Sequence, residues 1–168
     1  MKALAAIAAT LVCAAAYAHS SSDAYLTLDV PRNGDSIVIA GRWDIALRDL
    51  HFVLALDDDG DGAITWGEMR RHRADIESYA YARLRVAGEA AACTIERGRM
   101  LVAAHADGGY ASLEFRIACP RGVRAPRLDY RLFFDVDPSH RGIVIVRNGG
   151  AVATSLASPG SRTIALAP

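Results

Sequence analysis

Apolar and polar residues alternate along much of this chain with a period of two, which is typical of half-buried β-strands. Leu26, Leu28 and Val30 alternate with polar residues in a strand that ends at Pro31. A longer alternating run over 37–47 places Trp43 on its apolar face. Further alternating or apolar segments predict strands at 84–86, 93–95, 101–105, 111–117, 128–134, 143–146, 152–156 and 162–166.

Turn signals separate these segments. Asn33-Gly34-Asp35, Asp107-Gly108-Gly109 and Asn148-Gly149-Gly150 each combine glycine with Asn or Asp, the residues that enter tight turns at low cost. The last of them lies between two apolar runs and predicts a β-hairpin. Many short strands with turns between them favour a mainly β fold, and we expect a β-sandwich of the Ig-like type.

The period changes between residues 49 and 82, where the pattern becomes helical. Asp49 is expected to cap a short helix over 50–56. Thr65 and Glu68 have the spacing of a capping box, which predicts a second helix over 66–82. The sequence therefore predicts a helix–loop–helix inserted among the early strands.

The segment between the two expected helices matches the twelve-residue EF-hand pattern D-x-[DN]-x-[DN]-G-x5-E without a gap. Calcium is a hard cation that takes six to eight oxygen ligands, and Gly62 stands where the loop needs a sharp turn. The alternative is an acidic turn that binds no metal, but the closely spaced carboxylates would then repel one another without compensation. The expected calcium ligands are Asp57, Asp59, Asp61, the carbonyl of Ala63, Thr65 directly or through water, and Glu68.

The flanks of this loop differ from those of a paired EF-hand. The entering helix spans about two turns, and the sequence contains no second matching loop. We expect a dissociation constant in the extracellular range of about 10⁻⁴–10⁻³ M, which suits a structural or compartment-sensing role better than a fast switch.

The first 18 residues have the pattern of a secretory signal peptide. Lys2 precedes an apolar stretch, and Ala16-Tyr17-Ala18 is an A-x-A cleavage site. The alternative of a membrane anchor is disfavoured because the stretch is short for a span of about 20 residues. We therefore expect an exported, periplasmic or secreted protein of 168 − 18 = 150 residues, 19–168, forming one domain without a membrane span.

Charge and cysteine content narrow the function further. After Lys2 every basic residue outside histidine is arginine, so 18 Arg against 19 Asp plus Glu leave the exported chain at −1, which indicates no nucleic-acid partner. Cys93 and Cys119 remain after cleavage, and in an exported protein such a pair predicts a disulfide. The alternative is two buried free thiols.

The stretches HSSSDAYL (19–26), GRWDIALRDL (41–50), LDYRLFFDVDP (128–138) and HRG (140–142), with the calcium loop, span nearly all of the exported chain. In these stretches the chain resembles the exported N-terminal domain of bacterial membrane proteins of the HupE/UreJ type. The resemblance implies a metal-related role, because such proteins continue into transmembrane helices associated with transport of nickel or other metals. Since this chain ends at Pro168, we expect a stand-alone relative or a truncated product, with a membrane permease as a possible partner.

Two other functions stay open. His19 would be the mature N-terminal residue, and its amine and imidazole could hold nickel or copper together with His51, His105 or His140, as an accessory domain for metal uptake would. Asp135, Asp137 and His140 form a weaker candidate metal cluster. No nucleophile or phosphate-loop motif is present, so we expect no enzyme, and a hydrolase with structural calcium is the remaining alternative.

Overall fold

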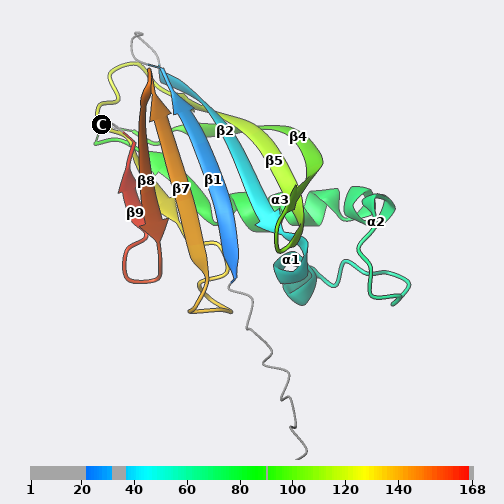
Figure 1. The fold of residues 1–168 in the computed structure, drawn as a ribbon. Coiled ribbons are helices and arrows are strands. Elements are labelled where there is room, and N and C mark those ends of the chain that lie inside the picture. The colour runs from blue at the N-terminus through cyan, green and yellow to red at the C-terminus, as the bar shows by residue number, and fades with distance from the viewer. Residues whose placement is uncertain (1–21, 32–36, 90, 167–168) are drawn as a thin grey trace, which may run out of the picture.

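The computed structural model describes residues 22–31, 37–89 and 91–166 (Figure 1). The expected signal peptide, His19 and the Asn33-Gly34-Asp35 turn lie outside the described residues. In chain order the elements are β1 (Asp23–Val30), β2 (Ile37–Ala46), α1 (Leu47–Leu54), α2 (Trp66–Arg71), α3 (Arg73–Tyr81), β3 (Leu84–Ala87), β4 (Thr94–His105), β5 (Gly108–Cys119), β6 (Arg127–Tyr130), β7 (Arg141–Asn148), β8 (Ala151–Ala157) and β9 (Thr163–Ala165).

A larger sheet has the strand order β4-β5-β2-β1-β7-β8 (Figure 1). Its neighbouring strands are antiparallel except for β1 and β7, which pair in parallel, Tyr25 opposite Ile143. The expected hairpin is confirmed as β7 and β8, joined at Gly149 and Gly150, whose positive φ angles of 48° and 102° glycine adopts without strain. The fold is mainly β, as the alternating pattern predicted.

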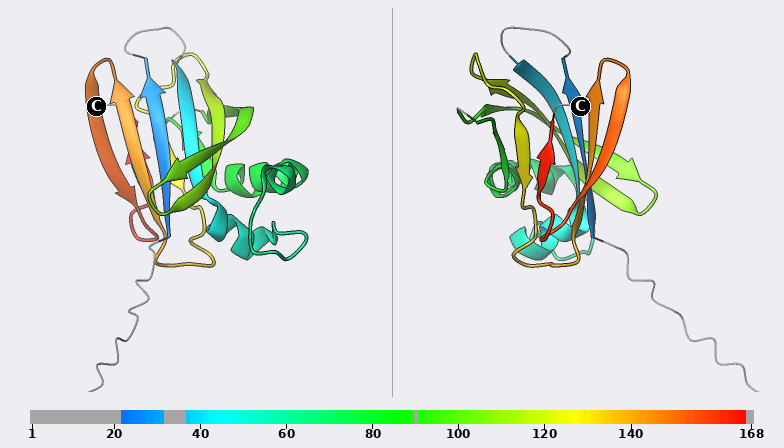
Figure 2. Two further views of the ribbon diagram at one scale, coloured as in Figure 1. Left: turned by 45° about the vertical axis from the view of Figure 1, so that its right-hand side comes forward. Right: turned by 90° about the vertical axis from the view of Figure 1, so that its left-hand side faces the viewer.

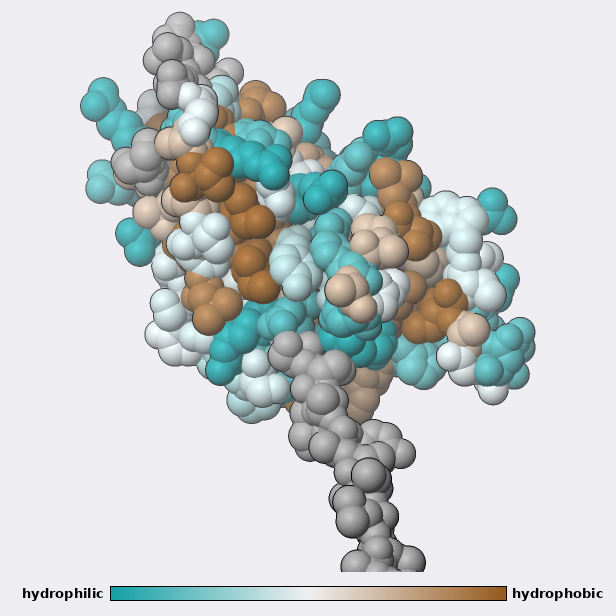
Figure 3. All heavy atoms as spheres, viewed as in Figure 1, coloured by the Kyte–Doolittle hydropathy of each residue, from teal (hydrophilic) through white to brown (hydrophobic). Residues whose placement is uncertain are grey.

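A smaller sheet, β3-β6-β9, lies on one face of the larger one together with the helices (Figure 2). The apolar core fills the space between these layers, because alternate residues of β1 and β2 point inward and are fully buried. The ring of Trp43 on β2 meets that of Tyr130 on β6, with centroids 5.5 Å apart. The opposite face of the larger sheet carries apolar side chains over β7 and β8 (Figure 3).

The helical segment lies between β2 and β3, but two of its details were predicted wrongly. Helix α1 begins at Leu47, directly after β2, and Asp49 lies in its first turn without capping it. Burial of Leu47 and Leu50 explains the earlier start. The single helix expected over 66–82 is broken at His72, where φ −87° and ψ 8° end α2 and begin α3.

Two strand predictions also change. The strand expected over 128–134 ends at Tyr130, and Phe133 adopts a left-handed φ of 57°. Its ring is buried against Tyr79 and His140, which offsets the cost of that backbone conformation. The two short strands expected between 93 and 105 form one strand, β4, whose register shifts between Arg97 and Met100.

The disulfide prediction is confirmed. Cys93 and Cys119 are bonded at an S–S distance of 2.03 Å, which ties the start of β4 to the end of β5. The alternative of two free thiols is therefore wrong. In the part of the chain that the structure describes, no helix has the length and apolar content that a membrane crossing requires.

Candidate metal centre

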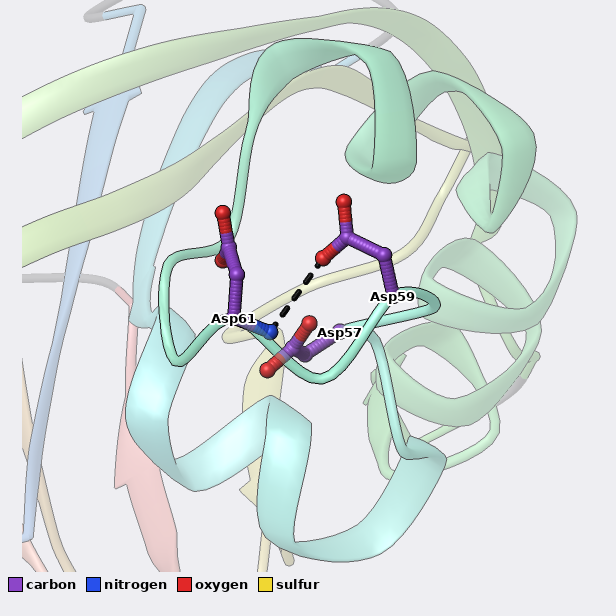
Figure 4. Close-up of side chains that lie close together, drawn as sticks. All are labelled: Asp57, Asp59 and Asp61. Atoms are coloured by element: carbon purple, nitrogen blue, oxygen red, sulfur yellow. Dashed lines mark hydrogen bonds between the residues drawn. The ribbon is translucent and has the colours of Figure 1, made fainter.

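Three aspartate side chains converge in the loop between α1 and α2. Asp57, Asp59 and Asp61 each present a carboxylate oxygen, and these oxygens lie within 4.8 Å of one another (Figure 4). Among the described residues, this is the only group of His, Cys, Asp and Glu side chains with a spacing suited to one metal ion. The structure thus brings together the first three ligands that the sequence predicted.

Backbone hydrogen bonds hold this arrangement. The N–H groups of Gly60 and Gly62 donate to the two oxygens of Asp57 at 2.8 and 2.9 Å. The N–H of Asp61 donates to Asp59 Oδ1 at 3.3 Å, and the N–H of Ala63 donates to Asp61 Oδ1 at 2.8 Å (Figure 4 shows the former). Such bonds wind the loop around its own carboxylates and leave other lone pairs of the same oxygens available.

Glycine is required where the loop reverses. Gly60 and Gly62 have φ angles of 72° and 84°, a region that strains residues with a Cβ atom. The sequence marked Gly62 through the loop pattern, whereas Gly60 stands at a position where that pattern accepts any residue. The backbone therefore shows a requirement that the motif alone does not state.

Glu68, the last expected ligand, lies in a different environment from the three aspartates. Its Oε2 accepts hydrogen bonds from the N–H and the hydroxyl of Thr65, both at 2.8 Å, and its Oε1 accepts one from the N–H of Asp58 at 2.9 Å. The N–H of Glu68 donates in turn to the Thr65 hydroxyl, which completes the predicted capping box at the start of α2. The bonds from Thr65, then that from Asp58, lower the pKa of Glu68.

Asp58 pairs with two basic side chains beside the loop. Arg71 Nε donates to its Oδ2 at 2.8 Å, and His72 Nε2 donates to its Oδ1 at 2.7 Å. The His72 bond, followed by the Arg71 bond, lowers the pKa of Asp58, and the same contact raises the pKa of His72. Asp58 thus anchors the end of α2 to the loop, a role that the sequence did not indicate because its partners lie more than a full loop length away.

The other expected metal ligands are not brought together. His51 Nδ1 accepts the N–H of Asp57 at 3.3 Å, and His105 Nε2 lies 3.2 Å from Asp44 Oδ2 on the larger sheet. His140 is fully buried and bonded to Tyr130. Each of the three histidines proposed as a partner of His19 therefore has a separate environment.

The second acidic cluster is also dispersed. Asp135 pairs with Arg83 at 2.7 Å, and Asp137 accepts the N–H and hydroxyl of Ser139 at 2.8 and 2.6 Å. His140 faces the core. The candidate cluster of Asp135, Asp137 and His140 is instead a turn after β6 with local hydrogen bonds.

No protein-family model matches this chain, and no curated protein matches it. The candidate metal centre is therefore supported by its geometry: three carboxylates lie close together in a loop whose turns are made by Gly60 and Gly62.

Proposed function

We propose that the loop from Asp57 to Glu68 binds one calcium ion. The observation that carries this proposal is the convergence of the Asp57, Asp59 and Asp61 oxygens within 4.8 Å. Carboxylate oxygens are the ligands that calcium prefers, and a dication between them would relieve their mutual repulsion. The nearby cations serve Asp58 instead, which keeps the three clustered carboxylates available for a metal.

The remaining ligands would come from the carbonyl of Ala63, from Thr65 and from Glu68. The Glu68 carboxylate accepts capping-box hydrogen bonds that stabilise the start of α2. To ligate the ion, it would give up some of these bonds. Binding would therefore couple the ion to the orientation of α2 relative to the loop. This arrangement supports a single EF-hand inserted in an Ig-like β-sandwich, with calcium fixing the geometry of the insertion.

We infer a binding protein rather than an enzyme, exported to the periplasm or secreted. The disulfide supports export, because such bonds persist in oxidising compartments. The resemblance to HupE/UreJ-type proteins supports action beside a membrane permease. The alternatives, nickel or copper uptake through His19 and a hydrolase with structural calcium, remain outcomes of the tests below.

A calcium titration by calorimetry tests the proposal, using the protein without its signal peptide. We expect saturable binding of one ion with a dissociation constant of about 10⁻⁴–10⁻³ M. Glu68→Gln removes one ligand charge and should weaken binding at least about tenfold, as expected for loss of a charged contact. Glu96→Gln is the matched control, because it makes the same substitution at an exposed position on β4, outside the loop.

The outcomes separate the hypotheses. Binding that is lost in Glu68→Gln and retained in Glu96→Gln supports ligation by the predicted residues. Equal weakening in both variants would indicate only general attraction to an acidic surface. Absence of calcium binding, with tight nickel or copper binding that disappears when His19 is replaced by alanine, would refute the calcium proposal in favour of metal uptake.

A further inference from the structure

A pocket of about 390 Å³ lies away from the calcium loop, between α1 and the segment that joins β6 to β7. These two segments lie at the same end of the molecule, next to the start of β1 (Figure 2). Its lining combines acidic and apolar side chains. The polar residues include Ser22, Asp49 and Asp137, and the apolar wall consists of Phe52, Phe133 and Val136.

Two carboxylates line this pocket. Asp49 Oδ2 accepts the Ser22 hydroxyl at 2.9 Å, and Asp137 accepts the N–H and hydroxyl of Ser139. Burial raises the pKa of Asp49 and outweighs the Ser22 hydrogen bond and the charge of Arg48, which lower it, while the negative charge of Asp137 raises it further. Asp49 is therefore a half-buried carboxylate close to a second one of the same charge.

His140 does not neutralise this pair. Its Nδ1 lies 2.7 Å from Ser22 Oγ, and its Nε2 lies 2.9 Å from the Tyr130 hydroxyl. Because the single proton of the Ser22 hydroxyl goes to Asp49, the His140 Nδ1–H must donate to Ser22, and Nε2 must accept from Tyr130. The imidazole is then neutral and only fixes the position of the Ser22 hydroxyl.

One cation, Arg48, lines the pocket and is shared between a carboxylate inside it and one outside it. Arg48 Nη2 bonds Asp107 Oδ2 at 3.0 Å, while its Nε lies 3.6 Å from Asp49 Oδ1. One arginine against Asp49 and Asp137 leaves the lining with a charge of 1 − 2 = −1. The nearby Asp23 adds to the negative potential at Asp49. The pocket thus has an excess of negative charge suited to one monovalent cation.

Two of the apolar residues that line the pocket are exposed to solvent. Phe52 on α1 is 77% exposed and Val136 is 45% exposed, whereas most large apolar side chains of this protein are in the core. An exposed aromatic ring beside carboxylates offers both apolar contact and a π face to a cation. A metal ion would use only the carboxylates and leave this wall uncovered.

We propose that this pocket binds a small organic ammonium ion with an apolar body. The ammonium group would lie between Asp49 and Asp137, and the body would cover Phe52 and Val136. Charge complementarity to the carboxylates together with apolar burial distinguishes this ligand class from inorganic cations and from anions. The site is separate from the calcium loop, so the proposal does not depend on calcium binding.

The test uses 2-phenylethylamine as the probe, titrated into the exported protein in calcium-containing buffer and followed by NMR of the backbone amides. The comparison compounds each remove one feature: methylammonium lacks the apolar body, 2-phenylethanol lacks the charge, and 3-phenylpropionate reverses it. We expect saturable binding of 2-phenylethylamine at least about tenfold tighter than that of each comparison compound, which is the effect of losing one charged or apolar contact.

Variants locate the site. Asp49→Asn and Phe52→Ala should each weaken 2-phenylethylamine binding at least about fivefold, as loss of one such contact predicts. Asp75→Asn and Val152→Ala are the controls, because they remove an exposed carboxylate and an exposed apolar side chain elsewhere. Phe52 is exposed, so its replacement leaves the core intact and keeps the test valid if Asp49→Asn fails to fold.

Three results would overturn the proposal. One is the absence of saturable 2-phenylethylamine binding at millimolar concentration. Another is equal affinity for 3-phenylpropionate, which would remove the role of the carboxylates. The third is unchanged binding in both Asp49→Asn and Phe52→Ala, which would place the ligand elsewhere.

Discussion

Acidification from pH 7.5 to 5 should destabilise this protein through one buried imidazole, that of His140. Its side chain is fully buried, bonded to Ser22 and Tyr130, and packed edge-on against Phe133 at a centroid distance of 5.0 Å. Both ring nitrogens already have hydrogen-bond partners that fit the neutral form. A proton added to this ring would place a charge in the core, so the folded state resists protonation.

The magnitude follows from the two pKa values. Burial lowers the pKa of His140 from an ordinary value of 6.5 to about 4 in the folded state. The unfolded chain therefore binds this proton first as the pH falls. The stabilisation from neutral His140 is complete above pH 6.5, is lost progressively between pH 6.5 and about 4, and amounts to about 2 kcal/mol lost at pH 5.

Urea denaturation at pH 7.5, 6.5, 5.5 and 5, with a calcium chelator throughout, measures the effect. His140→Gln is the comparison, because it removes the titrating group and keeps one polar end. The free energy of unfolding should fall by about 2 kcal/mol more in the natural protein than in the variant over this range. His72, whose pKa is raised by Asp58, changes stability in the opposite direction but does so in both proteins and cancels.

A second measurement covers the case in which His140→Gln does not fold. The imidazole resonances of His140, followed by NMR in the natural protein, should titrate below pH 5. Titration near pH 6.5 would refute the reasoning, as would parallel pH profiles of the two proteins.

Three further predictions concern stability and association. Replacing Cys93 and Cys119 by serine should lower the free energy of unfolding by about 3.5 kcal/mol, the loop-entropy value for their separation of 26 residues; denaturation equal to that of the natural protein would contradict it. Gly142→Ala should cost about 1–3 kcal/mol by the same assay, because a Cβ there would lie 2.5 Å from the ring of buried Tyr130, and Gly160→Ala, in open space, is its control. Strand β8 is an edge strand of the larger sheet, contains no charged residue and carries Val152, which is 64% exposed. Concentrated protein should therefore self-associate through β8, and Val152→Lys should reduce this association in sedimentation velocity. An unchanged distribution would show that β8 is not the contact.

Much of the candidate metal site followed from the sequence because its determinants are local. The three clustered aspartates, Gly62 and the Thr65–Glu68 capping box all lie within one twelve-residue segment, where spacing along the chain fixes spacing in space. The spacing of the motif did not predict the hydrogen bonds that the Glu68 carboxylate accepts from the backbone N–H groups of Thr65 and Asp58. These bonds compete with metal ligation for the same oxygens. Motif positions specify which atoms can ligate and leave open which competing hydrogen bonds they make.

The sequence by itself determined the mainly β character of the fold, the hairpin of β7 and β8, and the pair of cysteines able to bond. Each depends on periodicity, turn residues or residue type, which act over a few positions. The tertiary structure decided where the second helix breaks, at His72, whose side chain bonds Asp58 fourteen residues earlier. It also decided that β6 ends before Phe133, which is buried. It also decided the contact of Ser22 with His140 across 118 residues, which follows from the parallel pairing of β1 and β7. Such contacts depend on which segments the fold places side by side, and no pattern within one segment encodes that choice.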